Sequence, residues 1–289
     1  MAIVFDIVPD GRDFSCSADG SPPFFVGRRV PYEGNVGLYN LFGGSKLEKL
    51  LYSAADHSAI HGFWATFIEP TAICEGLNFL SLNTYDSAMF TFGFGQFAAH
   101  VADGDFVKYL RSMLQLPNTA EYFPDLAVVD GRICRTDGDR PVPLETGETT
   151  QPLMTYLNPD LSEVQDAEVL AAARLIHWTS THAAARDAQV GQMVSTYRAF
   201  MRRADRKVGI DGRSAHLCCV IADILHHGRG GRTTWPQVEA GLASARPFDA
   251  LIDIGASRWD DRKAKLKAAI NERADLFAKS WSRAQVDFV

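Results

Sequence analysis

Two acidic residues precede a glycine-patterned stretch within one short segment of the chain. Glu75 stands at the end of a helical pattern, Asp86 lies in a turn-prone stretch, and Thr91 precedes Gly93 and Gly95, which alternate with phenylalanine. Glycosidic bonds are cleaved by two carboxyl groups that flank a bound sugar. The types and the order of these residues therefore predict a glycosidase site.

Glu75 is the predicted general acid, which protonates the leaving oxygen. This role needs a carboxyl group that stays protonated near neutral pH. At a helix C-terminus the carboxylate meets the negative end of the helix dipole, and Leu77 and Phe79 can desolvate it. We therefore expect a raised pKa for Glu75.

Asp86 is the predicted general base. It lies on a turn that can fold back over the helix end, where a wetter environment keeps a carboxylate ionised. With the help of Thr91 it can hold a water on the sugar face opposite Glu75. This arrangement predicts an inverting reaction.

Further residues are predicted to contact the substrate. Glycines without side chains let a sugar ring approach the strand backbone, and a glutamine can hydrogen-bond to the sugar. Two residues beyond a later helix end are expected to line the same cleft. The predicted substrate-binding residues are Tyr85, Gly93, Gly95, Gln96, His227 and Arg229.

The same segment resembles the catalytic segment of phage-type lysozymes, where Glu-Gly-Leu is followed by an Asp and a Thr-x-Gly-x-Gly strand. Residues 75–77, Asp86 and residues 91–95 carry this resemblance. Asp86 and residues 90–93 are also similar to chitosanases of the lysozyme-like superfamily, in which an Asp precedes an aromatic-Thr-x-Gly strand by the same interval. The chain departs from the phage enzymes at Gln96, where they carry His, and its two acids are closer together than in the chitosanases.

The resemblance implies a lysozyme-like muramidase that hydrolyses β-1,4 linkages of peptidoglycan without a metal or another cofactor. A chitosanase-like endo-hydrolase is the alternative enzyme, and an acidic cleft would favour it because chitosan is cationic. A third interpretation is a glycan-binding or phage structural protein that kept the fold and lost turnover.

The elements that position these residues are expected to be mostly helical. Apolar residues recur at helical spacing before Glu75 and over most of the second half, and a last long helix is expected over 259–281. Alternation over 83–98 predicts a small hairpin, and Asp130-Gly131 predicts a second one. We expect an α+β, predominantly helical, lysozyme-like fold with a small β-hairpin beside the catalytic helix end.

The domain boundaries are predicted from composition. Residues 1–45 are rich in Gly, Pro, Asp and Ser and are expected to form an extension of loops and short strands. The lysozyme-like domain is expected over 46–289, with a small β lobe at about 77–135 and a helical lobe at about 160–289. A loop is expected over 135–160, which is polar and rich in proline.

Composition narrows the class of protein. A chain of 289 residues with 46% hydrophobic content can bury the core of one large domain or two closely joined lobes. A formal charge of -6, with acids and bases interspersed, argues against nucleic acid as the main partner. We expect a polysaccharide partner, no membrane span and no signal peptide.

The five cysteines are scattered without CxxC spacing, which indicates reduced thiols and folding in a cytoplasm. Cell-wall glycans lie outside the cytoplasm. The protein would therefore reach them after cell lysis, in a phage particle or through a contact-dependent secretion machine. In the last case a delivery or immunity partner, which the sequence does not identify, would be expected.

Three other groups of residues have competing interpretations. The cluster of His216, Asp223, His226 and His227 could bind a metal, but it matches no zinc signature, and histidines at a helix C-terminus explain it better.

Cys74 could be a nucleophile with His61 or His100 as its base, although a buried thiol is the commoner case. The basic run over 198–207 is expected to be a solvated helix face, with anionic glycan binding as the weaker alternative.

Overall fold

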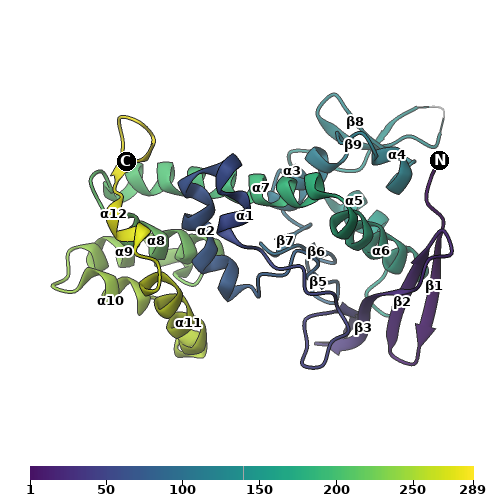
Figure 1. Cartoon of the computed structure of the whole chain (residues 1–289), viewed down its shortest axis with the longest axis horizontal. Coiled ribbons are helices and arrows are strands. Elements are labelled where there is room, and N and C mark those ends of the chain that lie inside the picture. The colour runs from purple at the N-terminus through teal and green to yellow at the C-terminus, as the bar shows by residue number, and fades with distance from the viewer. Residues whose placement is uncertain (139) are drawn as a thin grey trace. The chain divides into compact units, whose positions relative to one another are not determined.

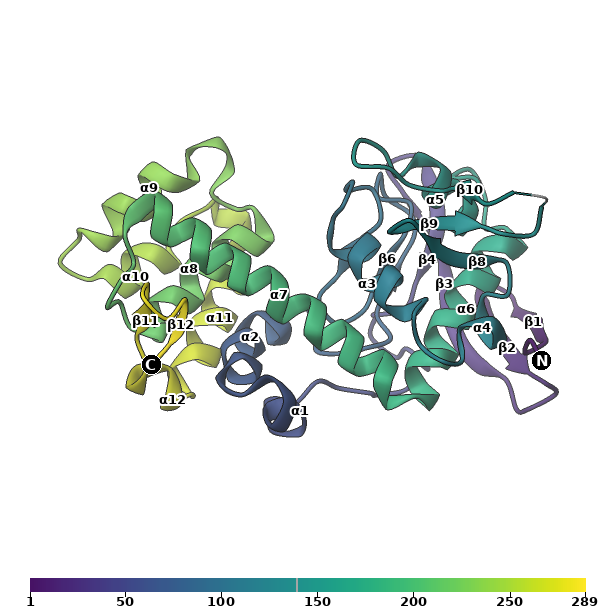
Figure 2. The same cartoon turned by 90° about the horizontal axis from the view of Figure 1, so that it is seen from above.

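The computed structural model describes residues 1–138 and 140–289. It divides the chain into two compact units: unit 1 comprises 1–51 and 78–192, and unit 2 comprises 52–77 and 193–289. Both units combine helices with antiparallel strands (Figures 1 and 2). The α+β, helix-rich architecture predicted from the sequence is thus observed. The predicted boundaries at residues 45 and 160 do not coincide with those of the units.

Unit 1 contains a seven-stranded antiparallel sheet whose strands follow the order of the chain. The strands are β1 (Phe5–Asp10), β2 (Asp13–Ala18), β3 (Phe24–Tyr32), β4 (Asn35–Tyr39), β5 (Leu82–Asn83), β6 (Thr91–Phe92) and β7 (Phe97–Ala98). The predicted hairpin over 83–98 is part of this sheet. Residues 1–45 are therefore not a separate extension, because they supply its first four strands.

The β3–β4 hairpin closes with a two-residue turn. Tyr32 pairs with Asn35, and both Glu33 and Gly34 have positive φ, at 50° and 91°. Such turns match the twist of the flanking strands and normally carry Asn or Gly at these positions. Glu33 is thus an unusual residue for its backbone conformation.

The helices of unit 1 pack on this sheet and on one another. They are α3 (Asp105–Met113), α4 (Thr119–Tyr122), α5 (Gln151–Leu157), α6 (Asp166–Thr181) and the first part of α7 (Ala183–Val208). Helix α6 lies against β1, β2 and β3. Its Trp178 is buried and stacks on Tyr122 with ring centroids 4.8 Å apart.

A second, three-stranded sheet is formed by β8 (Leu126–Val129), β9 (Arg132–Arg135) and β10 (Val142–Pro143). The predicted Asp130-Gly131 turn joins β8 to β9, with φ values of 51° and 75°. The expected loop over 135–160 is wrong in part, because β10 and α5 lie within it.

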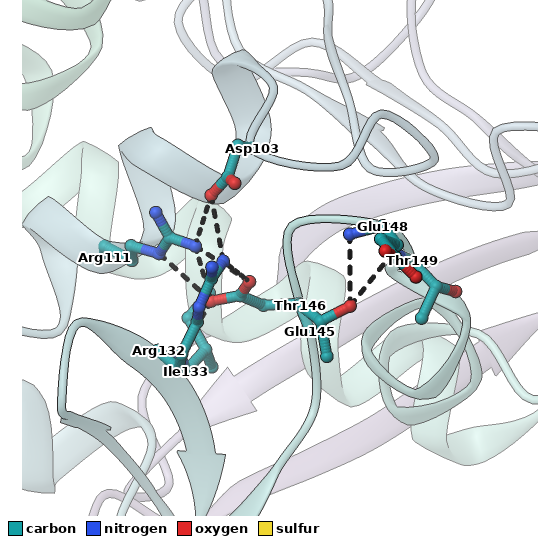
Figure 3. A network of polar contacts seen from close by, with 8 residues as sticks. All are labelled: Asp103, Arg111, Arg132, Ile133, Glu145, Thr146, Glu148 and Thr149. Carbon is teal, nitrogen blue, oxygen red and sulfur yellow. Dashed lines mark hydrogen bonds and ion pairs between the residues drawn. The ribbon is translucent and has the colours of Figure 1, made fainter.

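A buried ion-pair network fixes β9 to α3 (Figure 3). The Glu145 side chain is fully buried and accepts bonds from Arg111 at 2.7 Å and Arg132 at 3.0 Å, and both arginines also bind Asp103. The amide of Ile133 adds a hydrogen bond of 2.9 Å to the same carboxylate. Because its partners compensate the buried charge, this network is a structural element.

Unit 2 is built from helices and a C-terminal hairpin. The elements are α1 (Ala54–His61), α2 (Phe63–Cys74), the rest of α7, α8 (Ala215–His227), α9 (Thr234–Leu242), α10 (Pro247–Ile252), α11 (Asp260–Asn271), α12 (Asp275–Ala278), β11 (Trp281–Ser282) and β12 (Asp287–Phe288). The long helix predicted over 259–281 is wrong, because α11 ends at Asn271. No described helix is long and apolar enough to span a membrane.

The C-terminal hairpin completes the core around α2. Phe288 lies 4.6 Å from Phe67 between ring centroids, and the indole of Trp64 donates a 2.8 Å hydrogen bond to Asp287. Helix α2 ends at Cys74 with Glu75 as its C-cap, which confirms the helix end predicted there. The amide of Leu77 returns to the carbonyl of Ala72 at 2.9 Å and closes this helix end.

Candidate active site

A pocket of about 470 Å³ lies in unit 1 beside Asp86. Its walls are the tip of the β3–β4 hairpin, the turn that carries Asp86 and the β6–β7 hairpin. The residues lining it are Tyr32, Glu33, Asn35, Asn83, Asp86, Ser87, Ala88, Thr91, Gln96, Ala98 and His100. The structure therefore brings together three predicted site residues, Asp86, Thr91 and Gln96.

The Asp86 carboxylate is held in one orientation by its own turn. Oδ1 accepts the amide of Ala88 at 2.9 Å, and Oδ2 accepts the side-chain amide of Asn83 at 3.0 Å. The side chain remains partly exposed at the pocket. Each carboxylate oxygen has two lone pairs, so Asp86 can also bind a water molecule and accept its proton.

Thr91 is positioned by backbone pairing with Asn83 on one side and Ala98 on the other. It is 6% exposed and forms part of the pocket wall together with Asp86. A hydroxyl at this place can help to orient a water beside the carboxylate. The predicted pairing of a turn aspartate with a strand threonine is thus geometrically available.

The sequence predicts that Gly93 lies on a strand, but the structure places it in a turn. Strand β6 ends at Phe92, and Gly93 begins the turn to β7 with a φ of 87°. The side-chain amide of Gln189 fills the space beside Gly93 and binds the amide of Phe94 at 3.2 Å and the carbonyl of Phe79 at 3.1 Å. The predicted approach of a sugar ring at Gly93 is therefore wrong.

Gly95 and Tyr85 also have packing roles instead of the predicted contacts. Gly95 is buried in the turn and is not among the residues lining the pocket. Tyr85 packs against Tyr32 and Tyr39, with ring centroids 5.1 and 5.9 Å away. Tyr32, which is 47% exposed, forms the aromatic wall in its place.

Glu75 belongs to unit 2, where it joins a cluster of charged residues. Its Oε1 lies 2.7 Å from Nη1 of Arg262 and 3.6 Å from Nε2 of His226. Arg262 also binds Asp223 at 2.8 Å, and Asp223 pairs in turn with Arg229. Asp223 and His226 come from α8 and Arg262 from α11, so residues distant in sequence meet at the end of α2.

The predicted direction of the Glu75 pKa shift is wrong. Burial raises the pKa, but the hydrogen bond and charge of His226 and the charge of Arg262 outweigh it and bring the pKa of Glu75 to about 2. Burial lowers the pKa of His226, but Glu75 outweighs that effect and raises it above the ordinary value. The proton of this pair therefore resides on the histidine.

His227 and Arg229 lie around the same cluster. Burial, and then the charge of Arg262, lower the pKa of His227, whose ring packs against Trp259 at 4.4 Å. The Arg229 side chain is fully buried, and its Nε donates to the carbonyl of Ile254 at 3.0 Å. Arg229 is therefore a structural residue, and its predicted contact with substrate is wrong.

The other candidate chemistries receive no support. In residues 1–138 and 140–289, no group of three or more His, Cys, Asp and Glu side chains is arranged to hold a metal ion. His216 is instead sandwiched between Phe248 and Phe277. Burial raises the pKa of the Cys74 thiol to about 12, which leaves little of the reactive thiolate.

Several residues of the Asp86 pocket and of the charged cluster around Glu75 had not been predicted. Arg262 has no local signal, because its role depends on how α11 packs against α2 and α8. Tyr32 and Glu33 could have been noticed from the Glu-Gly turn between two alternating stretches. Their place beside Asp86 follows from the pairing of Tyr39 with Asn83, which is a long-range contact.

No protein family model, curated protein or solved structure matches the chain. Any assignment of function therefore depends on the residues and geometry described above.

Proposed function

We propose that the protein is a lysozyme-like glycoside hydrolase that cleaves β-1,4 linkages in polymers of amino sugars, with peptidoglycan as the first substrate. The observation that carries this proposal is the pocket beside Asp86. A fixed carboxylate, a threonine, three amide side chains and an exposed tyrosine surround a space within the size range of ligand pockets. Such polar groups beside an aromatic wall suit a sugar ring.

Asp86 acts in this proposal as the general base. Its carboxylate accepts a proton from a water that Thr91 helps to orient, and the water oxygen attacks the anomeric carbon. The bond to the leaving oxygen breaks at the same time, and a general acid supplies the proton for that oxygen. The expected product has the inverted anomeric configuration.

Glu75 acts in this proposal as the general acid, with His226 as its proton source. Because Glu75 is ionised in the free protein, a proton must reach it before or during bond cleavage. The nearby His226 ring holds that proton. The proton balance then requires that the general acid regains its proton from His226 and that the proton taken by Asp86 returns to solvent.

The experiment that tests the proposal is digestion of purified peptidoglycan by the full chain, with the released reducing ends counted. We expect release by the wild type and at least tenfold less by Glu75→Gln, since a well-placed general acid contributes about 100-fold or more. The exposed Glu163→Gln serves as the control. Full activity of Glu75→Gln would contradict its role as the acid.

A chitosanase-like activity is the second candidate, and the charge of the pocket favours it. Glu33 and Asp86 both line the pocket, and no lysine or arginine is among its lining residues. A polymer of cationic glucosamine would be attracted to such a site. Peptidoglycan carries acidic groups, so the negative charge of Glu33 and Asp86 would not attract it.

Glu33→Gln separates the two substrates. If chitosan is the substrate, loss of this exposed charge should lower kcat/KM on chitosan about two- to fivefold, the range expected for a surface charge pair. The rate on peptidoglycan should stay the same or rise. An unchanged ratio of the two rates would contradict a role of Glu33 in choosing a cationic polymer.

Binding without turnover is the remaining candidate. A protein that holds either polymer but releases no reducing ends would be a glycan-binding protein of this fold. Sedimentation of the chain with insoluble peptidoglycan, run beside the digestion assay, distinguishes this outcome.

A further inference from the structure

Glu168 is a buried carboxyl group that the proposed reaction does not use. It lies in the first turn of α6, and it is completely buried. Its Oε1 accepts hydrogen bonds from the Thr84 hydroxyl and, at 3.2 Å, from the amide of Leu38. Its Oε2 is buried without a hydrogen-bond partner in the described part of the chain. A carboxyl group in this state is costly for a fold to keep.

The partners of Glu168 belong to the two sides of the Asp86 pocket. Leu38 is in β4, which continues from the hairpin tip with Tyr32 and Glu33. Thr84 stands two residues before Asp86. Glu168 therefore connects one wall of the pocket to the turn that carries the proposed base.

The packing around Thr84 leaves this segment little freedom. A side chain at Gly37 would come within 2.7 Å of both the backbone and the hydroxyl of Thr84, so β4 and the Thr84 segment touch directly. Asn158, which is fully buried, donates to the carbonyls of Thr84 at 3.0 Å and Met89 at 2.9 Å. The Asp86 turn is thereby held at both ends, and the hydroxyl link to Glu168 is its only contact with a buried carboxyl group among the described residues.

We propose that Glu168 is a positioning residue for the pocket, and that its hydrogen bond with Thr84 sets the orientation of the Asp86 turn. The ionised carboxylate is a strong acceptor for the Thr84 hydroxyl. Protonation weakens Oε1 as an acceptor and places a hydroxyl group at Oε2, for which the described residues supply no hydrogen-bond partner. The protonation state of Glu168 is thus transmitted to Asp86 over two residues. Only the consequence for catalysis rests on the proposed function.

Glu168 changes its protonation state near neutral pH, so its link to the Asp86 turn is expected to respond to pH in that range. Burial raises its pKa to about 7, and the Thr84 hydroxyl and the backbone amides of Leu38 and Gln165 oppose this rise. Helix α6, which itself carries Asp166, packs against β1, β2, β3, α4 and α5. The ionisable groups of these elements include Asp6, Cys16, Arg28, Glu121 and Tyr156. None of these groups contributes to the shift of Glu168.

The test follows the backbone amide of Ala88, which donates to the Asp86 carboxylate, by ¹⁵N NMR between pH 5 and pH 8.5. The full chain, Glu168→Gln, Thr84→Val and the exposed control Glu163→Gln are compared. All four carry His100→Gln, because this histidine also lines the pocket and imidazoles titrate in the same range. Glu168→Gln imitates the protonated carboxyl group. Thr84→Val removes the hydroxyl link to Glu168 together with the 2.6 Å hydrogen bond that this hydroxyl accepts from the Leu38 amide.

We expect the Ala88 amide to titrate with a midpoint near pH 7 in the full chain and in Glu163→Gln. The transition should be absent in Glu168→Gln and in Thr84→Val. Absence of the transition in the full chain, or its persistence in either of these variants, would overturn the proposal. If Glu168→Gln does not fold, Thr84→Val still tests whether the Ala88 titration depends on the link between Thr84 and Glu168.

Hydrolysis supplies a separate readout. In Glu168→Gln we expect kcat to fall about tenfold with little change in KM, since small misplacements of a catalytic group cost one to two orders of magnitude in rate. The limb of the pH profile near pH 7 should disappear as well. If the wild type cleaves no glycan, the proposed function fails, whereas the Ala88 titration still tests Glu168 as a positioning residue.

Discussion

The position of Glu75 at a helix end was predicted from its neighbours in the sequence, but its ionisation state was not. The helix end at Glu75 was predicted correctly from the sequence, and burial does raise the pKa of its carboxyl group. The cations that reverse this balance come from positions 226 and 262, which no local pattern connects to position 75. Sequence reasoning therefore found the candidate residue but missed its ionisation state.

The charge cluster predicts the effect of removing its central cation. In Arg262→Ala, Glu75 loses a close positive charge, and Asp223 keeps only Arg229 as an ion-pair partner. We expect the pKa of Glu75 to rise, because burial is then opposed by His226 alone. Breaking a buried pair should also lower the free energy of unfolding at pH 7 by about 3 kcal/mol or more.

Carboxyl ¹³C NMR and urea unfolding measure these two effects. The depressed pKa of Glu75 stabilises the fold above its unfolded value of 4.5, and this contribution is lost as pH falls toward 2. The cost of Arg262→Ala should therefore shrink on acidification. A cost that is the same at pH 3 and pH 7 would show that the ion pairs contribute little.

The contribution of Glu168 to the free energy of unfolding is expected to have the opposite pH dependence to that of Glu75. The pKa of Glu168 is raised from 4.5 in the unfolded chain to about 7 in the fold, so the folded state binds more protons between these values. The free energy of unfolding should then fall by up to about 3 kcal/mol from pH 4.5 to pH 7. Urea unfolding at pH 5 and pH 8 should show this loss in the wild type and in Glu163→Gln, but not in Glu168→Gln.

At the scale of elements, the sequence predicted local turns well and long-range pairing poorly. The end of α2 and the Asp130-Gly131 turn were found because their signals lie within a few residues. The first four strands were underestimated because β4 pairs with β5 across more than forty residues of chain. The last helix was overextended because the β11–β12 hairpin packs against α2, a contact that periodicity does not report.

The turn between β6 and β7 gives a prediction at this scale. Gly93→Ala must adopt a positive φ and also displace the Gln189 amide, whereas Gly11→Ala has a positive φ but open space around it. We expect Gly11→Ala to cost about 1 kcal/mol of unfolding free energy and Gly93→Ala about 2 to 4 kcal/mol. Thermal unfolding of both variants measures the difference. Equal costs would mean that Gln189 does not constrain the turn.

At the scale of the whole molecule, the segment that first indicated function is divided between two units. Residues up to 77 belong with the C-terminal half, and residues from 78 belong with the sheet. The predicted β lobe begins at about residue 77, close to this boundary, but no pattern in the sequence indicated that residues 52–77 pack with the C-terminal half. The two proposed catalytic carboxyls, Glu75 and Asp86, thus belong to different units, each with its own supporting residues.

The central claim is that Asp86 is the base of a glycosidase. Its most direct test is the initial rate of reducing-end release from peptidoglycan and from chitosan by the full chain, by Asp86→Asn and by the exposed control Asp130→Asn. We expect cleavage of at least one polymer by the wild type and the control, with a rate at least about 100-fold lower for Asp86→Asn. No release by the wild type, or full activity of Asp86→Asn, would contradict the claim.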